Sequence, residues 1–248
     1  MIQERGRVTW LDFYNWNENL NSDQISTSNV TWAEPQRQLA CISWLEALAQ
    51  THGLVPSSLR VASADASFRR YLRVDTQAGA SLIVMDAPPP QEDCRPFVKV
   101  AQLLAEARLN VPQILAADLE RGFLLLNDLG RQTYLDVINE GNADELFADA
   151  MQALLAFQQL PMSTPLPSYD DALLRRELQL FPEWYVQRHL GVTLTAAQLA
   201  LWQRASQLLI DSALAQPKVL VHRDYMPRNL MLSEPNPGVL DFQDAVYG

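Results

Sequence analysis

The sequence reads His222-Arg223-Asp224-Tyr225-Met226-Pro227-Arg228-Asn229 and then, after a Pro/Gly turn, Val239-Leu240-Asp241-Phe242. A carboxylate at Asp224 can accept the proton of a hydroxyl group. The amide oxygen of Asn229 and the carboxylate of Asp241 can hold Mg²⁺ against nucleotide phosphates. Three polar side chains with three different tasks therefore predict the active centre of a phosphotransferase.

Short apolar runs flank these polar residues, at 219–221 before His222 and at 230–232 after Asn229. They predict that the polar residues lie on a loop between paired strands. Each residue alone has a simpler explanation, because Asp and Asn are common in turns and His222 could bond a backbone carbonyl at a strand end. The full pattern, H-x-D-x-x-x-x-N followed by a strand ending in Asp-Phe, favours the catalytic interpretation.

The composition indicates a globular protein with a small-molecule partner. A chain of 248 residues, 48% of them hydrophobic, can build one large domain or two small lobes around a buried core. The 29 acidic and 19 basic residues give a net charge of −10, which argues against nucleic-acid and anionic membrane partners. Neither a signal peptide nor a run of about 20 apolar residues occurs. Cys41 and Cys94 lack the spacing of a metal site and suit a reducing compartment better than a disulfide-linked secreted fold. These features predict a cytoplasmic protein. We also expect a monomer.

Hydrophobic periodicity predicts an order of helices and strands. Residues 1–36 show no sustained period, and we expect a loosely structured arm there. The elements predicted in the first half are a helix at 37–51, strands at 71–74 and 81–85 joined by a hairpin turn, a helix at 95–109 and a strand at 122–126. The second half is mostly helical, with apolar stripes at 146–157 and 201–209. A boundary between two parts of the chain is expected at 126–130.

The catalytic motif resembles the catalytic loop and metal-binding strand of the aminoglycoside phosphotransferase and choline kinase superfamily. Residues 225–231 and 241–245 are most similar to the branch that contains the bacterial anomeric kinase for N-acetylmuramate and N-acetylglucosamine. The similarity covers residues 37–248. It implies an α+β, protein-kinase-like fold with a small β-rich N-terminal lobe for the nucleotide (37–128). A mostly helical C-terminal lobe (129–248) would carry the catalytic loop and the metal-binding strand.

The resemblance also implies a role for each position of the motif. Asp224 would be the catalytic base, Asn229 and Asp241 the Mg²⁺ ligands, and His222 a structural brace of the loop. Arg228 would either neutralise phosphate charge or lie on the surface as an ordinary solvated arginine.

Two positions after Asp241 keep alternative interpretations. Asp244 would help to bind Mg²⁺ or sugar, or would cap a turn. Gln243 stands where the protein kinases have the glycine of Asp-Phe-Gly.

The nucleotide contacts are expected at two places. The segment ahead of the hairpin resembles the family's nucleotide loop by position, since its small residues let backbone N–H groups approach phosphates and its arginines can pair with them. The contacts expected there are Ser63, Ser67, Phe68, Arg69 and Arg70. Between the lobes, Leu126, Asn127 and Asp128 are expected to form an extended hinge against the adenine of ATP.

The predicted strand 82–85 lacks the lysine that the superfamily usually places against the α- and β-phosphates, and Met85-Asp86 occupies that neighbourhood. We favour replacement of this charge by Arg69 or Arg70; weak nucleotide binding is the alternative.

The resemblance implies transfer of a phosphoryl group from ATP, with Mg²⁺, to a hydroxyl of a small amino sugar, with anomeric phosphorylation in cell-wall recycling as the favoured reaction. Residues 169–187 combine charge and aromatic rings suited to holding a sugar. The alternatives are an antibiotic kinase, whose cationic substrates would suit the charge of −10, and a non-catalytic nucleotide-binding or truncated remnant. The sequence stops seven residues after Asp241. We therefore expect an incomplete C-terminal lobe that binds nucleotide more readily than it phosphorylates sugar.

Overall fold

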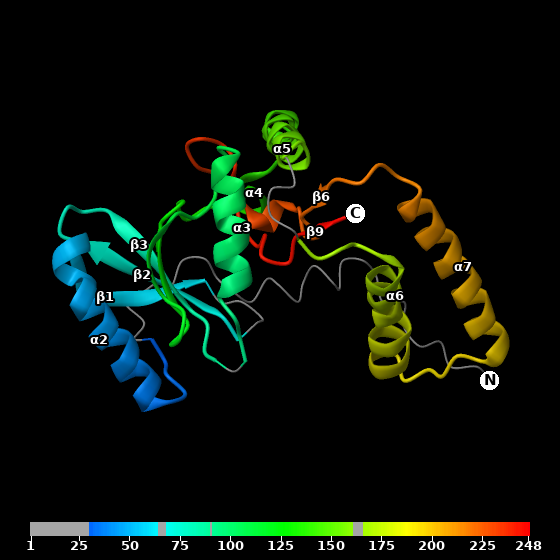
Figure 1. Cartoon of the computed structure of the whole chain (residues 1–248), viewed down its shortest axis with the longest axis horizontal. Helices are drawn as coiled ribbons and strands as arrows, with labels where there is room; N and C mark the ends of the chain where they lie inside the picture. Colours follow the sequence, from blue (N-terminus) through cyan, green and yellow to red (C-terminus); the bar gives the residue numbers. More distant parts are fainter. Residues whose placement is uncertain (1–29, 64–67, 90, 161–165) are drawn as a thin grey trace.

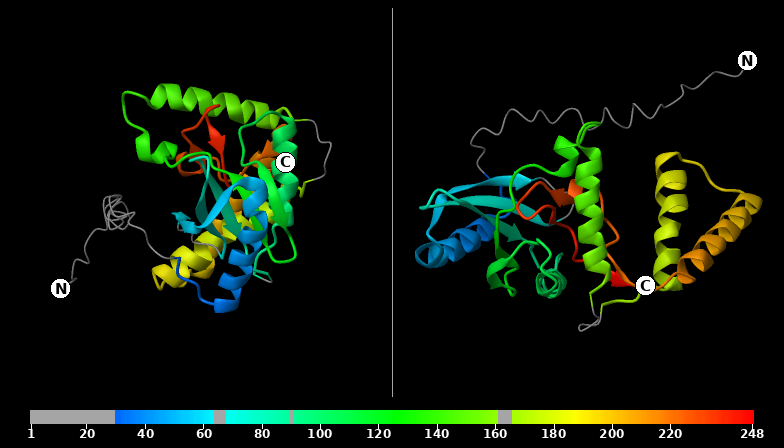
Figure 2. Two further views of the ribbon diagram at one scale, coloured as in Figure 1. Left: turned by 90° about the vertical axis from the view of Figure 1, so that its left-hand side faces the viewer. Right: turned by 90° about the horizontal axis from the view of Figure 1, so that it is seen from above.

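A computed structural model describes residues 30–63, 68–89, 91–160 and 166–248. A five-stranded antiparallel sheet lies at one end of the molecule and the hairpin of helices α6 and α7 at the other, with the segments that carry the catalytic motif between them (Figures 1 and 2). This mixed architecture confirms the predicted α+β class. None of the helices in these described ranges combines the length and apolar character needed to cross a bilayer.

The sheet has the order β1-β2-β3-β5-β4. Its strands are β1 (Leu54–Ser63), β2 (Arg70–Thr76), β3 (Ser81–Asp86), β4 (Ile114–Asp118) and β5 (Phe123–Asn127). The predicted hairpin is confirmed, since β2 pairs with β3 and Gly79 supplies a left-handed turn conformation with φ 83°. The predicted third strand is confirmed as β5.

Two helices cover opposite faces of this sheet. Helix α2 (Pro35–His52) ends at Gly53 in the left-handed conformation and packs on Phe123 and Leu125 of β5. Helix α3 (Arg95–Glu106) packs on the alternate residues Leu124 and Leu126. Strand β5 is therefore apolar at successive positions because both of its faces are buried. Both helices were predicted from their periodicity.

The second half contains α4 (Tyr134–Val137), α5 (Ala143–Gln158), α6 (Asp171–Leu180), the π-helix η1 (Phe181–His189) and α7 (Ala196–Leu214). The catalytic motif follows on the short strands β6 (Leu220–Val221), β7 (Leu230–Met231), β8 (Gly238–Val239) and β9 (Val246–Tyr247), with the 3₁₀ turn η2 (Pro227–Asn229) before β7. One apolar core joins this part to the sheet. Phe97 of α3 lies with its ring centroid 4.9 Å from that of Phe242, directly after Asp241.

Three sequence predictions need correction. The catalytic residues do not lie between strands that pair with each other, because β6 pairs with β9 and β7 pairs with β8. Asp241 does not end a strand, since β8 stops at Val239 and Asp241 has φ 60°. Residues 35 and 36, assigned to the arm, already belong to α2, while 1–29 lie outside the described residues.

Strands β1 and β4 were not predicted. Strand β1 contains Pro56, which removes a backbone donor and is tolerated here because β1 is an edge strand. Strand β4, at the other edge, has only five residues and alternates half-buried with exposed positions. Strand β1 has no continuous apolar run, and the apolar run of β4 is only the four residues 114–117, two of them alanine.

Candidate active site

His222 anchors the loop that carries the catalytic motif. Its ring is buried, and its Nε2 lies 3.0 Å from the backbone oxygen of Leu240. A carbonyl oxygen only accepts, so this bond requires the proton on Nε2. Burial lowers the pKa of His222, which the bond to Leu240 and the charges of Asp241 and Asp224 offset only in part. The neutral ring therefore ties the loop to the residue before Asp241.

The pairing of β7 with β8 brings Asn229 next to Asp241. Leu230 lies opposite Val239, and the backbone N–H of Leu240 donates to the oxygen of Asn229 at 2.9 Å. The side-chain amide nitrogen of Asn229 then lies 2.9 Å from the backbone oxygen of Asp224 and 3.3 Å from Oδ2 of Asp241. The three residues predicted from the motif thus lie side by side.

Oxygen ligands of this kind fit Mg²⁺, which usually keeps several waters and takes one or two protein carboxylates plus substrate phosphates. The described residues contain no cluster of three or more His, Cys, Asp and Glu side chains able to hold a metal. Asn229 and Asp241 would each offer one oxygen and would leave the other positions to water and phosphate oxygens.

Backbone strain accompanies the site. Among the described residues other than glycine, only Arg108, Arg223 and Asp241 have positive φ angles, and two of these three flank the catalytic loop. A positive φ costs energy for a residue with a side chain, and such strain tends to collect at functional sites. Arg223, with φ 77°, precedes Asp224 and so sets the direction in which the chain presents it.

Arg223 also connects the loop to α6. Its Nε donates to Oε1 of Glu177 at 2.9 Å, and the hydroxyl of Tyr169 donates to Oε2 of the same carboxylate at 2.5 Å. Its Nη1 donates to the backbone oxygen of Asp244 at 3.3 Å. Arg228, the weaker catalytic candidate, lies exposed on η2.

A hollow of about 370 Å³ opens between α6 and α7, beside the contact of Arg223 with Glu177. Tyr169 and Glu177, from the segment predicted to hold a sugar, line it together with Leu174, Leu178, Phe181, Trp202, Leu209, Ile210 and Ala213. Burial raises the pKa of Tyr169 to about 12, with further contributions from Glu177 and from the charge of Asp224. The polar end of the hollow therefore lies at the carboxylate that binds Arg223, the residue before the predicted base.

The residues predicted to bind phosphate lie at the edge of the sheet. Ser63 ends β1 and is exposed, as is Phe68, whereas Ser67 lies outside the described residues. Arg69 pairs with Glu92 at 2.9 Å. Arg70 pairs with Asp86, which is fully buried and also receives Nε of Arg37 at 2.8 Å. Both arginines favoured as the lysine replacement therefore already have carboxylate partners in this structure.

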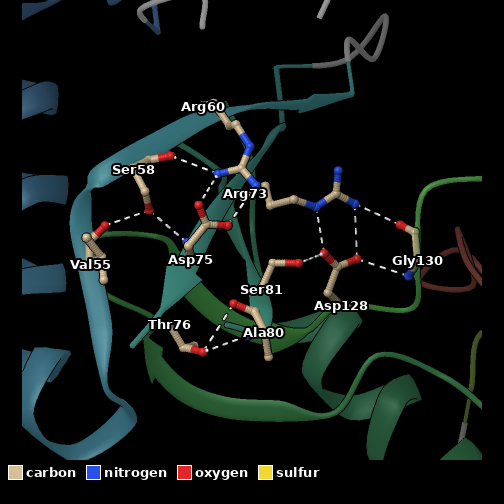
Figure 3. A network of polar contacts seen from close by, with 10 residues as sticks. All are labelled: Val55, Ser58, Arg60, Arg73, Asp75, Thr76, Ala80, Ser81, Asp128 and Gly130. Carbon is tan, nitrogen blue, oxygen red and sulfur yellow. Dashed lines mark hydrogen bonds and ion pairs between the residues drawn. The ribbon is translucent and has the colours of Figure 1, made fainter. Parts of the chain in front are cut away.

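The predicted hinge residues differ in what they expose. Leu126 is buried in the core, and Asn127 pairs with the backbone of Gln113. Burial disfavours the ionised carboxylate of Asp128, but hydrogen bonds from Arg73, Ser81 and the backbone N–H of Gly130 outweigh it and lower the pKa of Asp128 (Figure 3). Both carboxylate oxygens of Asp128 are already hydrogen-bonded. If Asp128 contacts a nucleotide, it would therefore do so through its backbone.

The contacts that sequence reasoning missed around these sites include the Arg73–Asp128 pair, the Arg223–Glu177 pair and the hydrogen bond from Gln243 to Asp241. The charge of Arg73 inside the predicted strand 71–74 is the signal that could have indicated a buried partner. Nothing in the sequence identified that partner, which lies 55 positions away.

The sequence profile of the phosphotransferase enzyme family matches residues 58–248. A protein of Pseudomonas putida named N-acetylmuramate/N-acetylglucosamine kinase is 74% identical over 197 residues, which cover 79% of this chain and 58% of the relative. A protein of Pseudomonas aeruginosa with the same name is 64% identical over 220 residues, covering 86% of this chain and 64% of the relative. The chain thus spans about three fifths of the length of these relatives.

Two solved structures have a similar fold. Choline kinase LicA from Streptococcus pneumoniae matches with a TM-score of 0.59 at 12% identity, over 85% of this chain and 70% of LicA. The streptomycin–ATP–APH(2'')-IIa ternary complex matches with a TM-score of 0.56 at 16% identity, over 89% of this chain and 73% of the other. These likenesses confirm the predicted kinase-like architecture.

Proposed function

Because this chain belongs to the phosphotransferase enzyme family, we propose that it serves the ATP-dependent phosphorylation of a hydroxyl on N-acetylmuramate or N-acetylglucosamine. The names of its relatives suggest these two sugars. The observation that carries the proposal is the contact of Asn229 with both Asp224 and Asp241. The family membership confirms the resemblance inferred from the catalytic and metal-binding motifs.

In this proposal Asp224 accepts the proton of the attacking hydroxyl, and Asn229 with Asp241 holds Mg²⁺, which would neutralise charge on the transferred phosphoryl group. Phosphoryl transfer depends mainly on alignment and charge neutralisation. His222 serves alignment, since its bond to Leu240 fixes the loop against the segment that carries Asp241. Arg228 is proposed as an exposed cation at the phosphate side.

We propose that the nucleotide binds between the sheet and the catalytic loop. The site would lie between an N-terminal lobe, residues 37–128, and a C-terminal lobe, residues 129–248. Arg69 and Arg70, with Ser63 and Phe68, would line the phosphate side. The backbone after Leu126 would face the adenine. A phosphate could reach Arg70 only by sharing it with Asp86, which predicts a modest affinity for ATP. Cytoplasmic location and a monomeric state stay predictions of the sequence.

The test compares the 248-residue chain with its Asp224→Asn variant, offering N-acetylmuramate, N-acetylglucosamine and kanamycin side by side with ATP and Mg²⁺. Nucleotide binding is measured separately by calorimetry, because the chain spans only part of the length of its relatives. We expect phosphorylation of the amino sugars and a loss of about 100-fold or more in kcat for Asp224→Asn. Turnover of kanamycin alone would indicate an antibiotic kinase, and Mg-ATP binding without any turnover would indicate a binding module.

A further inference from the structure

Arg73 and Asp128 form a buried two-point ion pair between the sheet and the chain that leaves it. Nε of Arg73 lies 2.6 Å from Oδ2 of Asp128, and Nη2 lies 3.0 Å from Oδ1 (Figure 3). The side chains are only 10% and 9% exposed. The hydroxyl of Ser81 donates to Oδ2 at 2.6 Å, and the backbone N–H of Gly130 donates to Oδ1 at 3.0 Å. Four hydrogen bonds thus engage both carboxylate oxygens.

Arg73 also holds the chain beyond Asp128, since its Nη2 donates to the backbone oxygen of Gly130 at 2.7 Å. We call residues 128–133 the link segment. The guanidinium group therefore binds the link segment at two residues, through a side chain and through the backbone. Because Arg73 lies in β2 between β1 and β3, these contacts fix the start of the link segment to the middle of the β1–β3 part of the sheet.

The far end of the link segment is attached to the strand that follows Asn229. The backbone N–H of Leu232 donates to the oxygen of Gln132 at 2.9 Å, and Thr133 pairs with Met231 of β7. Strand β7 begins directly after Asn229. A short, hydrogen-bonded path therefore runs from Arg73 through the link segment to one of the proposed Mg²⁺ ligands.

We propose that Arg73 and Asp128 are positioning residues that fix the sheet relative to Asn229 through the link segment. This inference rests on the proposed function. The sheet carries the proposed phosphate contacts and β7 follows the metal ligand, so their separation sets the alignment of the phosphates with Asp224. A misplacement of about 1 Å can cost about 100-fold in rate. The two side chains act through the link segment and do not touch the substrate; only the backbone of Asp128 lies in the stretch proposed to face the adenine.

A second pair in the same sheet provides a matched control. Arg60 of β1 and Asp75 of β2 also form a two-point contact beside the first pair, at 2.9 Å and 2.7 Å, but through Nη1 and Nη2 and with side chains that are 23% and 45% exposed (Figure 3). Arg60 also donates to the backbone oxygen of Ser58. The hydrogen bonds of these two side chains stay within β1 and β2, and Arg131 of the link segment acts on Asp75 through its charge without a hydrogen bond. The control pair therefore supports the sheet without hydrogen-bonding the link segment.

The variants must separate positioning from folding, because removing one partner of a buried pair leaves the other charge unpaired. Arg73→Lys keeps the charge but cannot form the two-point contact. The double variant Arg73→Met/Asp128→Leu removes both charges and keeps the volume. Arg60→Lys and Arg60→Met/Asp75→Leu are the matched controls, and all four are compared with wild type for Tm, for the Kd of Mg-ATP, and for kcat and KM.

We expect kcat to fall about tenfold or more in both Arg73 variants, with KM for the sugar little changed. The double variant should still unfold cooperatively but at a lower Tm, because the hydroxyl of Ser81 and the backbone groups of Gly130 lose their partners. The Arg60 variants should keep wild-type kcat. Unchanged kcat in folded Arg73 variants, or an equal loss in the Arg60 variants, would overturn the inference.

A distance measurement tests the inference even if turnover is absent. Spin labels on cysteines introduced at the exposed positions Gln77, in the β2–β3 turn, and Ala148, on α5, report the separation of the two parts. We expect a broader distance distribution in the Arg73 variants than in wild type or the Arg60 variants. Broadening without turnover in wild type would contradict the proposed function and support the positioning role. An unchanged distribution in the Arg73 variants would reject that role.

Discussion

The side-chain nitrogen of Gln243 donates a 2.7 Å hydrogen bond to Oδ1 of Asp241. Asn229 approaches the other oxygen, Oδ2, so two amide groups hold this carboxylate from opposite sides. Oε1 of Gln243 is buried, and it has no hydrogen-bond partner among the described residues. A buried oxygen without a partner costs stability, so Gln243 does not serve the fold alone, and its bond to Asp241 gives it a part in the site.

We predict that Gln243→Leu weakens the binding of Mg-ATP by about tenfold, as expected when a residue that orients a metal ligand is lost. The substitution removes the donor to Asp241 and the unpaired oxygen while keeping most of the volume. Thermal stability without ligand should therefore stay equal or rise. Calorimetric titration with Mg-ATP and with ATP in EDTA measures the effect, and equal losses under both conditions would argue against a role through the metal.

Removal of the proposed metal ligand itself should have a larger effect. Asp241→Asn keeps an oxygen that can accept from Gln243 but removes the negative charge that attracts a divalent cation. We expect about a 100-fold loss of kcat and no rise in Tm on addition of Mg-ATP, with the Tm of the unliganded protein within a few degrees of wild type. A Tm shift as large as in wild type would show that the cation binds elsewhere.

The sheet and its helices could be predicted because local patterns specify them. Gly79 marks the turn of the β2–β3 hairpin, and the apolar run of β5 marks a strand buried on both faces. The four strands around the catalytic loop are two residues each. Such short pieces have no period of their own, and tertiary contacts decide whether β6 pairs with β7 or with β9.

In the candidate site, too, local sequence patterns predicted some features, whereas others depend on tertiary contacts. The spacing of Asp224, Asn229 and Asp241 predicted a shared centre, and in the structure the side chain of Asn229 contacts the backbone of Asp224 and the carboxylate of Asp241. Their roles in catalysis stay a prediction. The partners of charged side chains were beyond prediction, because they join residues far apart in the chain. Arg70 is an example: its fit to a phosphate seemed a property of the loop, but buried Asp86 on the next strand already holds its guanidinium group.

Both cysteines should resist thiol reagents while the protein is folded. Burial, together with the charge of Asp86, raises the pKa of Cys41 to about 12, and burial raises the pKa of Cys94 to about 11. The thiolate is the reactive form, and at pH 8 almost none is present at either position. We expect a chromogenic disulfide reagent to label neither thiol within minutes at pH 8 and both in urea. Rapid labelling of Cys94 in the native protein would show that the start of α3 opens.

The pH dependence of stability should report the state of His222. Its pKa is lowered in the folded protein by burial, so below its ordinary value of about 6.5 the unfolded chain binds a proton that the folded protein does not. The free energy of unfolding should therefore fall as the pH drops through 6.5, by at most about 1.4 kcal/mol per pH unit from this group.

His222→Gln places a non-titrating amide donor near the oxygen of Leu240 and should flatten this part of the profile. Urea unfolding at pH 7.5, 6.5 and 5.5 measures both proteins, and parallel profiles would mean that the pKa of His222 is the same in the folded and the unfolded chain, against the lowering by burial.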